Sequence, residues 1–232
     1  MKKLLLIFGI LISGVIFTNN VKAQDCDFYF PFEKGTIVET TNYDKKNKET
    51  SKTYQKVLDY SKSNGVTEVK IENKIEAKDA DSVITQEFSV RCENGEFYIN
   101  MDSYLNQETM SAYQAMQIEV DADNMTIPAN VSKGQSLNDG RVSATILNSG
   151  IKVLTITVVI KNRKVDGFEK VTTPAGTFDC VKISYDMEMK MLFKIKASAT
   201  QWFAKGVGVV KSENYNKKGK LESTSMITKI TK

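Results

Sequence analysis

The sequence predicts a single antiparallel, all-β domain with one minor helix, preceded by a short N-terminal leader. Three observations predict this fold class. From about residue 35 onward, apolar and polar side chains alternate with the period of two that is typical of strands. Pairs of Asn or Asp with Gly, which favour the positive φ angles of tight hairpin turns, lie between the alternating runs. Only three prolines occur, and none interrupts a convincing strand.

The leader, residues 1–23, has the features of a secretory signal peptide. It begins with two lysines after Met1, continues with an apolar run over residues 4–17, and ends with side chains suited to cleavage after Ala23. At about 14 residues, the apolar run is too short to span a bilayer comfortably. A lipoprotein would need a small residue directly before its cysteine, whereas Asp25 precedes Cys26. We therefore expect a periplasmic or secreted protein with no stable membrane span in the mature chain.

The composition of the mature domain, residues 24–232, excludes several function classes. The leader removes three lysines and no acid, so the formal net charge falls from +4 to +1. A nearly neutral protein lacks the electrostatic field that gathers nucleic acid, and we expect no nucleic-acid partner. Histidine is absent, which removes the Ser-His-Asp triad, the Cys-His pair and the HExxH zinc site. We predict no catalytic residue, no metal site and no cofactor.

The clearest alternation covers residues 181–197 and predicts one long strand with one buried and one wetted face. Its apolar positions are Val181, Ile183, Tyr185, Met187, Met189, Met191, Phe193, Ile195 and Ala197. Shorter runs of the same kind lie at residues 69–75, 87–91 and 97–101. Residues 151–160 are instead apolar or neutral on both faces, which predicts a central strand covered on both sides.

Turn and helix signals complete the predicted fold. The dipeptides expected to turn the chain are Asn64-Gly65, Asn94-Gly95, Asp139-Gly140, Asp166-Gly167 and Lys218-Gly219. From Asp102 or Ser103, which can cap a helix, to about residue 117 the chain has a loose apolar stripe and few β-branched residues. This segment predicts the one helix. A lone helix must bury its apolar face on the sheet, so it could cover the doubly apolar strand.

Three cysteines, Cys26, Cys92 and Cys180, lie in a compartment that permits disulfides. An odd count allows one bridge and one free thiol, or no bridge, and three pairings are open. We prefer a Cys26–Cys92 bridge, because Cys180 lies in a strand-like run where a buried free thiol is common.

The most distinctive candidate site is the sequence Met187-x-Met189-x-Met191, with Tyr185 and Phe193 on the same face. Three thioethers could hold a soft ion such as Cu(I). They could also form an adaptable apolar surface for a lipid or peptide, or simply pack in the core. Core packing is the simplest interpretation. If the face binds a ligand, these five residues are the predicted ligand-binding set.

Four segments together resemble the TapB-like exported proteins, relatives of a larger group of domains of unknown function. They are TPAGTFDCVKI at residues 173–183, WFAKGVGVVK at 202–211, CDFYFPFEKGT at 26–36 and CENGEFY at 92–98. The resemblance spans most of the mature chain. It implies a highly curved, mostly antiparallel open sheet, similar to the half-barrels of lipoprotein carriers, and it offers no catalytic residues to carry over.

Three functions follow as hypotheses. The first is non-enzymatic binding of a lipid-like, amphipathic ligand, or of an envelope protein, in the concave face of the sheet, by a protein we expect to be a monomer. The second is a structural or assembly component of the cell envelope that acts through its sheet edges. The third is a hydrolase that uses carboxylates alone, although no Asp/Glu pair stands out.

Overall fold

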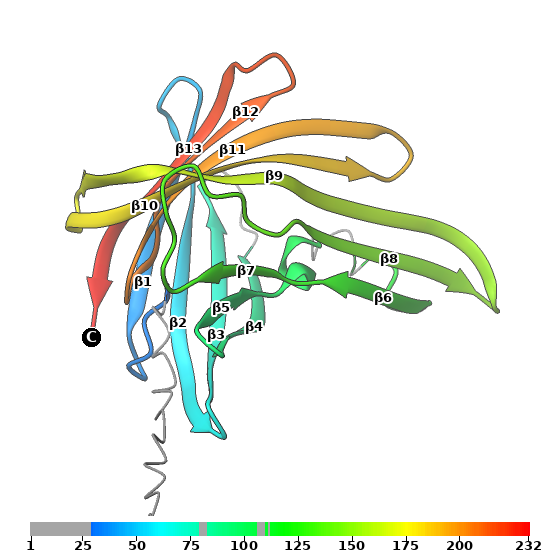
Figure 1. Cartoon of the computed structure of the whole chain (residues 1–232). Helices are drawn as coiled ribbons and strands as arrows, with labels where there is room; N and C mark the ends of the chain where they lie inside the picture. Colours follow the sequence, from blue (N-terminus) through cyan, green and yellow to red (C-terminus); the bar gives the residue numbers. More distant parts are fainter. Residues whose placement is uncertain (1–28, 79–82, 106–109, 111) are drawn as a thin grey trace, which may run out of the picture.

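The computed structural model describes residues 29–78, 83–105, 110 and 112–232, and these residues are almost entirely β-structure (Figure 1). The predicted leader and Cys26 lie outside the described residues. No helix in the described ranges is long and apolar enough to cross a membrane. The strands are β1 (Ile37–Asp44), β2 (Glu49–Ser63), β3 (Val66–Ala77), β4 (Val83–Glu93), β5 (Glu96–Ile99), β6 (Gln117–Asp123), β7 (Met125–Pro128), β8 (Gly140–Asn148), β9 (Ile151–Thr173), β10 (Gly176–Lys190), β11 (Lys194–Ala204), β12 (Gly208–Asn216) and β13 (Leu221–Thr231).

All the strands belong to one 13-stranded sheet in the order β6-β8-β9-β10-β11-β12-β13-β1-β2-β3-β4-β5-β7. Neighbours are antiparallel, as the sequence predicted. The two strands at the ends of this order, β6 and β7, are consecutive in the chain and separated by Asn124 alone. One stretch of chain therefore pairs with β8 in its first half and with β5 in its second half, which bends the sheet into a nearly closed barrel.

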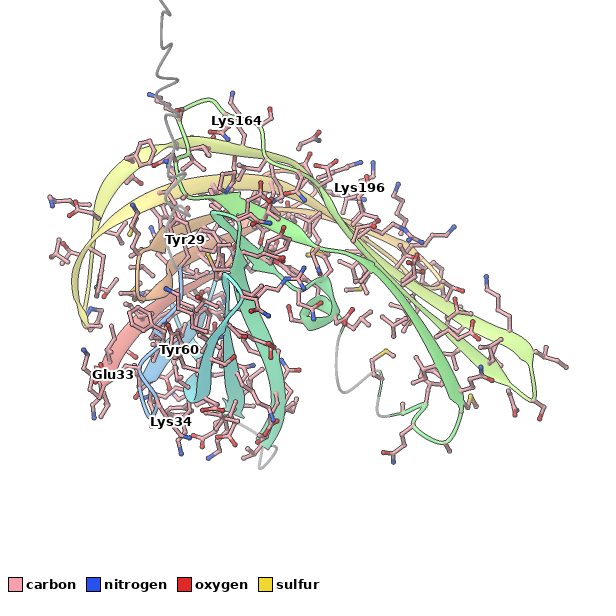
Figure 2. All side chains as sticks on the ribbon, turned by 60° about the horizontal axis from the view of Figure 1, so that its bottom comes forward. Tyr29, Glu33, Lys34, Tyr60, Lys164 and Lys196 are labelled. Atoms are coloured by element: carbon pink, nitrogen blue, oxygen red, sulfur yellow. The ribbon has the colours of Figure 1, made fainter. Side chains whose placement is uncertain are left out.

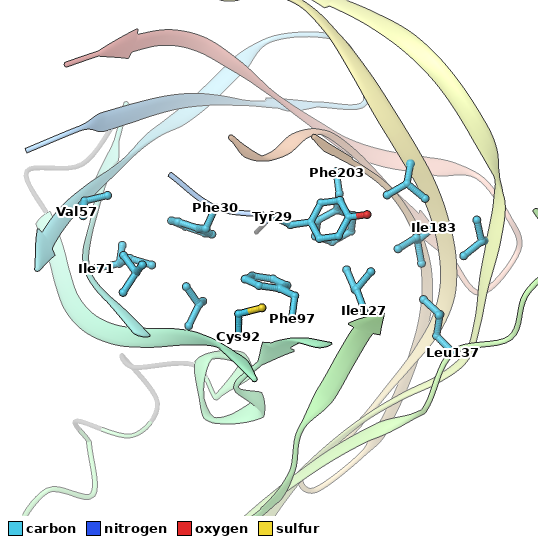
Figure 3. Close-up of a cluster of buried hydrophobic side chains, with 14 residues drawn as sticks. Tyr29, Phe30, Val57, Ile71, Cys92, Phe97, Ile127, Leu137, Ile183 and Phe203 are labelled. Carbon is cyan, nitrogen blue, oxygen red and sulfur yellow. The ribbon is translucent and has the colours of Figure 1, made fainter. Parts of the chain in front are cut away.

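The main core lies inside the curve of this sheet. Figure 3 shows Val57, Ile71, Phe97 and Ile183 pointing inward from opposite walls, and all four are buried. Figure 2 shows Tyr29 within the curve and Lys164 on its outside. One curved sheet can thus bury a core against itself, because opposite walls supply the facing side chains that a second sheet would supply in a sandwich.

Residues 181–197 do not form the single strand that their alternation predicted. They form a hairpin of β10 and β11 whose tip is Met191, Leu192 and Phe193. Met189 pairs with Ile195 across this hairpin, so apolar residues remain on one face through the turn. The turn carries no Gly, Pro or Asn, and a period-two pattern alone cannot show where a chain reverses.

The prediction that residues 151–160 are covered on both sides is also wrong. Ile156, Val158 and Ile160 are buried, whereas the alternate positions are partly exposed. On that outer face Thr157 shares a hydrogen bond with Ser143 of β8 at 3.2 Å. Thr157 is partly exposed, while its partner Ser143 is buried.

The hairpin-turn predictions are confirmed at Asn64-Gly65 and Asn94-Gly95, where both residues of each pair have positive φ. The Lys218-Gly219 turn is confirmed as well. Asp166-Gly167, by contrast, lies inside β9, where the pairing register with β10 shifts. Asp139-Gly140 leads into β8 without forming a hairpin. An Asp-Gly pair in a strand therefore marked a bulge.

The predicted helix falls partly outside the described residues, and Met110, which is described, is helical. A 3-10 turn, η1 (Met101–Tyr104), is followed by turns at residues 112–115, and β6 begins at Gln117; residues 106–109 and 111 lie outside the described ranges. Met101 and Leu105 pack on the buried face of β8 and β9. The segment therefore covers the apolar inner face of β9, as expected of the helix.

Candidate functional site

The inner face of the sheet near the β9–β10 turn carries an apolar floor. Val181 of β10 pairs with Phe168 of β9 on one side and with Phe203 of β11 on the other. Directly paired residues project from the same face of a sheet. Since Val181 and Phe203 belong to the main core, Phe168 also faces inward, yet 59% of its surface is exposed.

A charged rim lies next to this floor. Lys170 and Asp179 form the adjacent pair of β9 and β10, and the Lys170 ammonium lies 2.6 Å from the Asp179 carboxylate. Lys205 follows the end of β11 at the same level. The floor and the rim together enclose a pocket of about 830 Å³, which we call the outer pocket. Its lining residues are Tyr29, Phe168, Glu169, Lys170, Thr177, Phe178, Asp179, Cys180, Val181, Phe203, Ala204 and Lys205.

The N-terminal aromatic segment closes the inner end of the outer pocket. The Tyr29 ring meets Phe97 and Phe203 edge to face, with centroids 5.9 and 6.0 Å apart, and Phe30 meets Phe88 at 6.2 Å. Figure 3 shows Tyr29 and Phe30 at the centre of the barrel. Such edge-to-face pairs are favourable beyond the area they bury. These rings therefore fill the middle of the concave face.

A smaller inner pocket of about 280 Å³ lies beyond Tyr29 and Phe203, which line both pockets. Its walls are mostly aromatic and aliphatic, with polar groups at Gln55, Ser103, Tyr104 and Gln201. An apolar cavity with a few polar side chains is the common form of a small-molecule site.

The inner pocket borders a row of amides. Gln55, which lines the pocket, pairs with Asn73 of β3, and Asn73 pairs with Gln86 of β4. Asn73 is buried, and its Oδ1 has no hydrogen-bond partner among the described residues. Burying an unpaired polar atom costs free energy, so this end of the barrel has unused capacity for a hydrogen bond.

The five predicted ligand-binding residues do not line either concave pocket. Tyr185 is buried, and Met187 and Met189 are partly buried against the same cluster beneath η1. Met191 and Phe193 lie at the exposed β10–β11 tip. Tyr185, Met187 and Met189 thus lie in or against the core, which agrees with the core-packing interpretation. Met191 and Phe193 lie apart from them at the hairpin tip.

A polar latch at Arg163 was missed by sequence reasoning. Asn162 and Arg163 form a bulge in β9, which turns the Arg163 side chain inward, where it is 3% exposed. Its Nη1 donates to the backbone oxygens of Thr126 and Asn138 at 3.0 and 2.8 Å and to Asn138 Oδ1 at 3.2 Å. Burial lowers the pKa of Arg163, while the neighbouring Tyr104, Tyr185 and Asp139 act in the opposite direction.

Asn138 completes the latch. Its Oδ1 accepts from Thr126 N at 2.8 Å and Thr126 Oγ1 at 3.0 Å, and its Nδ2 donates to Asn124 O at 2.9 Å. Thr126 belongs to β7, which pairs with β5 along one edge, and Asn124 lies directly before this strand. Side chains therefore replace the missing strand partner along β7 and close the barrel seam.

The cysteines contribute structure rather than reactivity. Cys92 is disulfide-bonded, while Cys180 is free and buried, as expected. Burial raises the pKa of the Cys180 thiol to about 11, so it carries almost no thiolate at neutral pH. Because Cys26 lies outside the described residues, the Cys26–Cys92 pairing stays a prediction.

The described residues hold no cluster of three or more acidic or cysteine side chains that could bind a metal ion. Two carboxylates whose pKa is shifted are paired with lysines. The pKa of Glu188 is lowered to about 2 by hydrogen bonds from Lys161 and Lys194, and that of Glu39 is lowered by Lys52. A raised carboxyl pKa, which a general acid needs, is not found among the shifts resolved in the described part of the chain.

Comparison with known proteins places this barrel in a family. Residues 33–227 match the DUF3108-like family. The chain belongs to this family. A DUF3108-like assignment agrees with the exported, uncharacterised group that the sequence resembles, while the narrower TapB-like assignment stays a proposal.

Two solved structures share the fold of this DUF3108-like protein. One, from Bacteroides fragilis, is described as an exported protein with a YmcC-like fold; it is 25% identical, covers 89% of this chain and 100% of its own, and has a TM-score of 0.73. The other, from Parabacteroides distasonis, is described as a lipoprotein; it is 24% identical, covers 90% of this chain and 100% of its own, and has a TM-score of 0.74. No curated protein matches the sequence.

Proposed function

We propose that this protein is an exported, non-enzymatic binding protein that holds a lipid-like, amphipathic ligand in the outer concave pocket. The observation that carries the proposal is the open apolar floor beside a charged rim. The ligand's apolar part lies on Phe168, Val181 and Phe203, and its polar group meets Lys170, Asp179 and Lys205. At about 830 Å³, the pocket is within the usual range for small-molecule sites, roughly 300–1,000 Å³.

Export is part of the same proposal. The Bacteroides fragilis relative is described as exported, and residues 1–23 have the pattern of a cleaved signal peptide. The proposed mature protein begins after Ala23, acts as a monomer, and meets its ligand in the periplasm or outside the cell.

The test is calorimetric titration of the purified mature protein with dodecanoate. Phe168→Ser removes an exposed ring from the pocket floor. Burying a Phe side chain is worth about 1.5–3 kcal/mol, so affinity should fall roughly tenfold or more. Phe193→Ser is the matched control, because Phe193 is also an exposed aromatic ring but lies at the opposite end of β10. Equal affinity for both variants and the wild type would sink the proposal.

A second candidate function rests on the sheet edges. Strand β5 covers only residues 91–93 of β4, so residues 83–90 have no strand partner on that side among the described residues. The edge of β6 that faces away from β8 also has no strand partner among the described residues. Such edges can accept a strand from another protein. Pull-down with a strand peptide, abolished by Ser89→Pro in β4, would favour this assembly role.

A further inference from the structure

The β10–β11 tip exposes an unusual amount of apolar surface. Leu192 is 79% exposed, Phe193 81% and Ile195 59%, although most large apolar side chains of the barrel are buried. The surface continues inward along one face, because Met189 pairs with Ile195 and packs against the cluster beneath η1. Exposed apolar surface of this kind marks a site of contact with a membrane or a protein.

A second exposed apolar surface lies at the same end of the sheet. Lys190 of β10 pairs with Thr157 of β9, so the tip lies beside the outer half of β9. That half carries Ile151 and Val153, which are 72% and 54% exposed. Figure 1 shows the β8–β9 and β10–β11 hairpins projecting from the barrel on the same side. Apolar side chains therefore collect at the ends of two neighbouring hairpins.

Lysines outnumber acids on the two hairpins themselves. Lys190, Lys194 and Lys196 surround the apolar tip of β10–β11, and Lys152 lies at the end of β8–β9. Neither residues 189–212 nor residues 140–165 contain an acid. The neighbouring β6 carries Glu119, opposite Thr145 of β8, and Asp121, which is paired with Arg141 at 2.7 Å. The nearest acid in sequence, Glu188, is already engaged by Lys161 at 2.8 Å and Lys194 at 2.6 Å.

We propose that the two hairpin tips dock on an anionic membrane surface, with Leu192 and Phe193 inserted among the lipid headgroups. Apolar side chains at a projecting tip can enter the boundary between headgroups and acyl chains, while the lysines behind them remain at the level of the anionic headgroups. A projecting shape in which lysines outnumber acids fits a lipid surface better than a groove-forming protein partner, which would need a complementary cavity. This inference is independent of the ligand pocket, which lies at the opposite end of β10.

The experiment is co-sedimentation of the mature protein with vesicles of phosphatidylcholine containing about one-third phosphatidylglycerol. The wild type should bind, and Leu192→Ser/Phe193→Ser should reduce the partition coefficient at least tenfold. Phe32→Ser, which removes an exposed ring that packs beside Tyr60 of β2 and lines neither pocket, should bind as the wild type does. Vesicles of phosphatidylcholine alone, or salt raised to about 0.5 M, should weaken binding because the lysine contribution is lost or screened.

A second readout shows whether the tip enters the headgroup region. Phe193→Trp keeps an aromatic ring at the tip, and its emission above the wild-type Trp202 background should shift to shorter wavelength when anionic vesicles are added. Absence of vesicle binding, or binding that the double substitution leaves unchanged, overturns the proposal. A self-associating wild type that the double substitution makes monomeric, without any vesicle binding, also overturns it and assigns the tips to contact between copies of the chain.

Discussion

Replacing Asn138 with Ala is the sharpest test of how the barrel closes. The substitution removes an acceptor for Thr126 N, Thr126 Oγ1 and Arg163 Nη1, and a donor to Asn124 O. Neutral hydrogen bonds contribute roughly 0.5–1.5 kcal/mol and those to charged groups about 1.5–3 kcal/mol. Because Asn138 is exposed, water can replace some of the lost hydrogen bonds. We therefore expect the free energy of unfolding to fall by about 3 kcal/mol.

Urea denaturation followed by the fluorescence of Trp202, the single tryptophan, measures this change. Asn214→Ala is the matched control, because the Asn214 amide donates one neutral hydrogen bond, to Ser223 at 3.1 Å; its cost should be about 1 kcal/mol. Asn138→Asp keeps the acceptor beside Arg163 and should restore most of the loss. The latch is refuted if Asn138→Ala costs no more than Asn214→Ala.

Three further predictions concern packing, pH and thiol chemistry. A Cβ at position 140 would lie 2.3 Å from Met125 Cγ and 2.7 Å from Met101 Sδ, so Gly140→Ala should destabilise the barrel by roughly 1–3 kcal/mol in thermal unfolding; an unchanged melting temperature would contradict this. Because the pKa of Glu188 is lowered to about 2, its stabilising contribution is present above its usual value of 4.5 and is lost as pH falls towards 2. The stability gap between wild type and Glu188→Gln should therefore close across that window, whereas a gap constant with pH would rule out the ion pairs as its source. The buried Cys180 thiol should react with an aromatic disulfide reagent only after unfolding, and rapid labelling of the native protein would show that it is accessible.

Local patterns predicted the strand content because each strand buries one face. The alternation of Ile183, Tyr185 and Met187 and the positive φ of Asn64-Gly65 depend on near neighbours, and both were confirmed. The β10–β11 reversal was not predicted, because Leu192 and Phe193 continue the apolar pattern where a turn residue is usual. The covered central strand was wrong for a related reason: the Thr and Val side chains of β9 suit an exposed strand face as well as a buried one.

The candidate pocket could not be predicted from local patterns. It depends on the register that places Phe168, Val181 and Phe203 in one row, and on Tyr29 reaching the barrel centre. The latch depends on a bulge that aims Arg163 at Asn138, 25 residues earlier in the chain. The usable signal was the polar run Lys161-Asn162-Arg163-Lys164, which interrupts the period-two pattern of β9 ahead of an Asp-Gly pair, since such an interruption can mark a bulge.

Native mass spectrometry of the mature protein purified from its own cells shows whether the outer concave pocket holds an amphipathic ligand. We expect a bound mass that organic solvent extracts as a lipid-like molecule, present in the wild type and in Phe193→Ser but reduced in Phe168→Ser. A ligand-free mass for the wild type, or a bound mass that Phe168→Ser leaves unchanged, would contradict it.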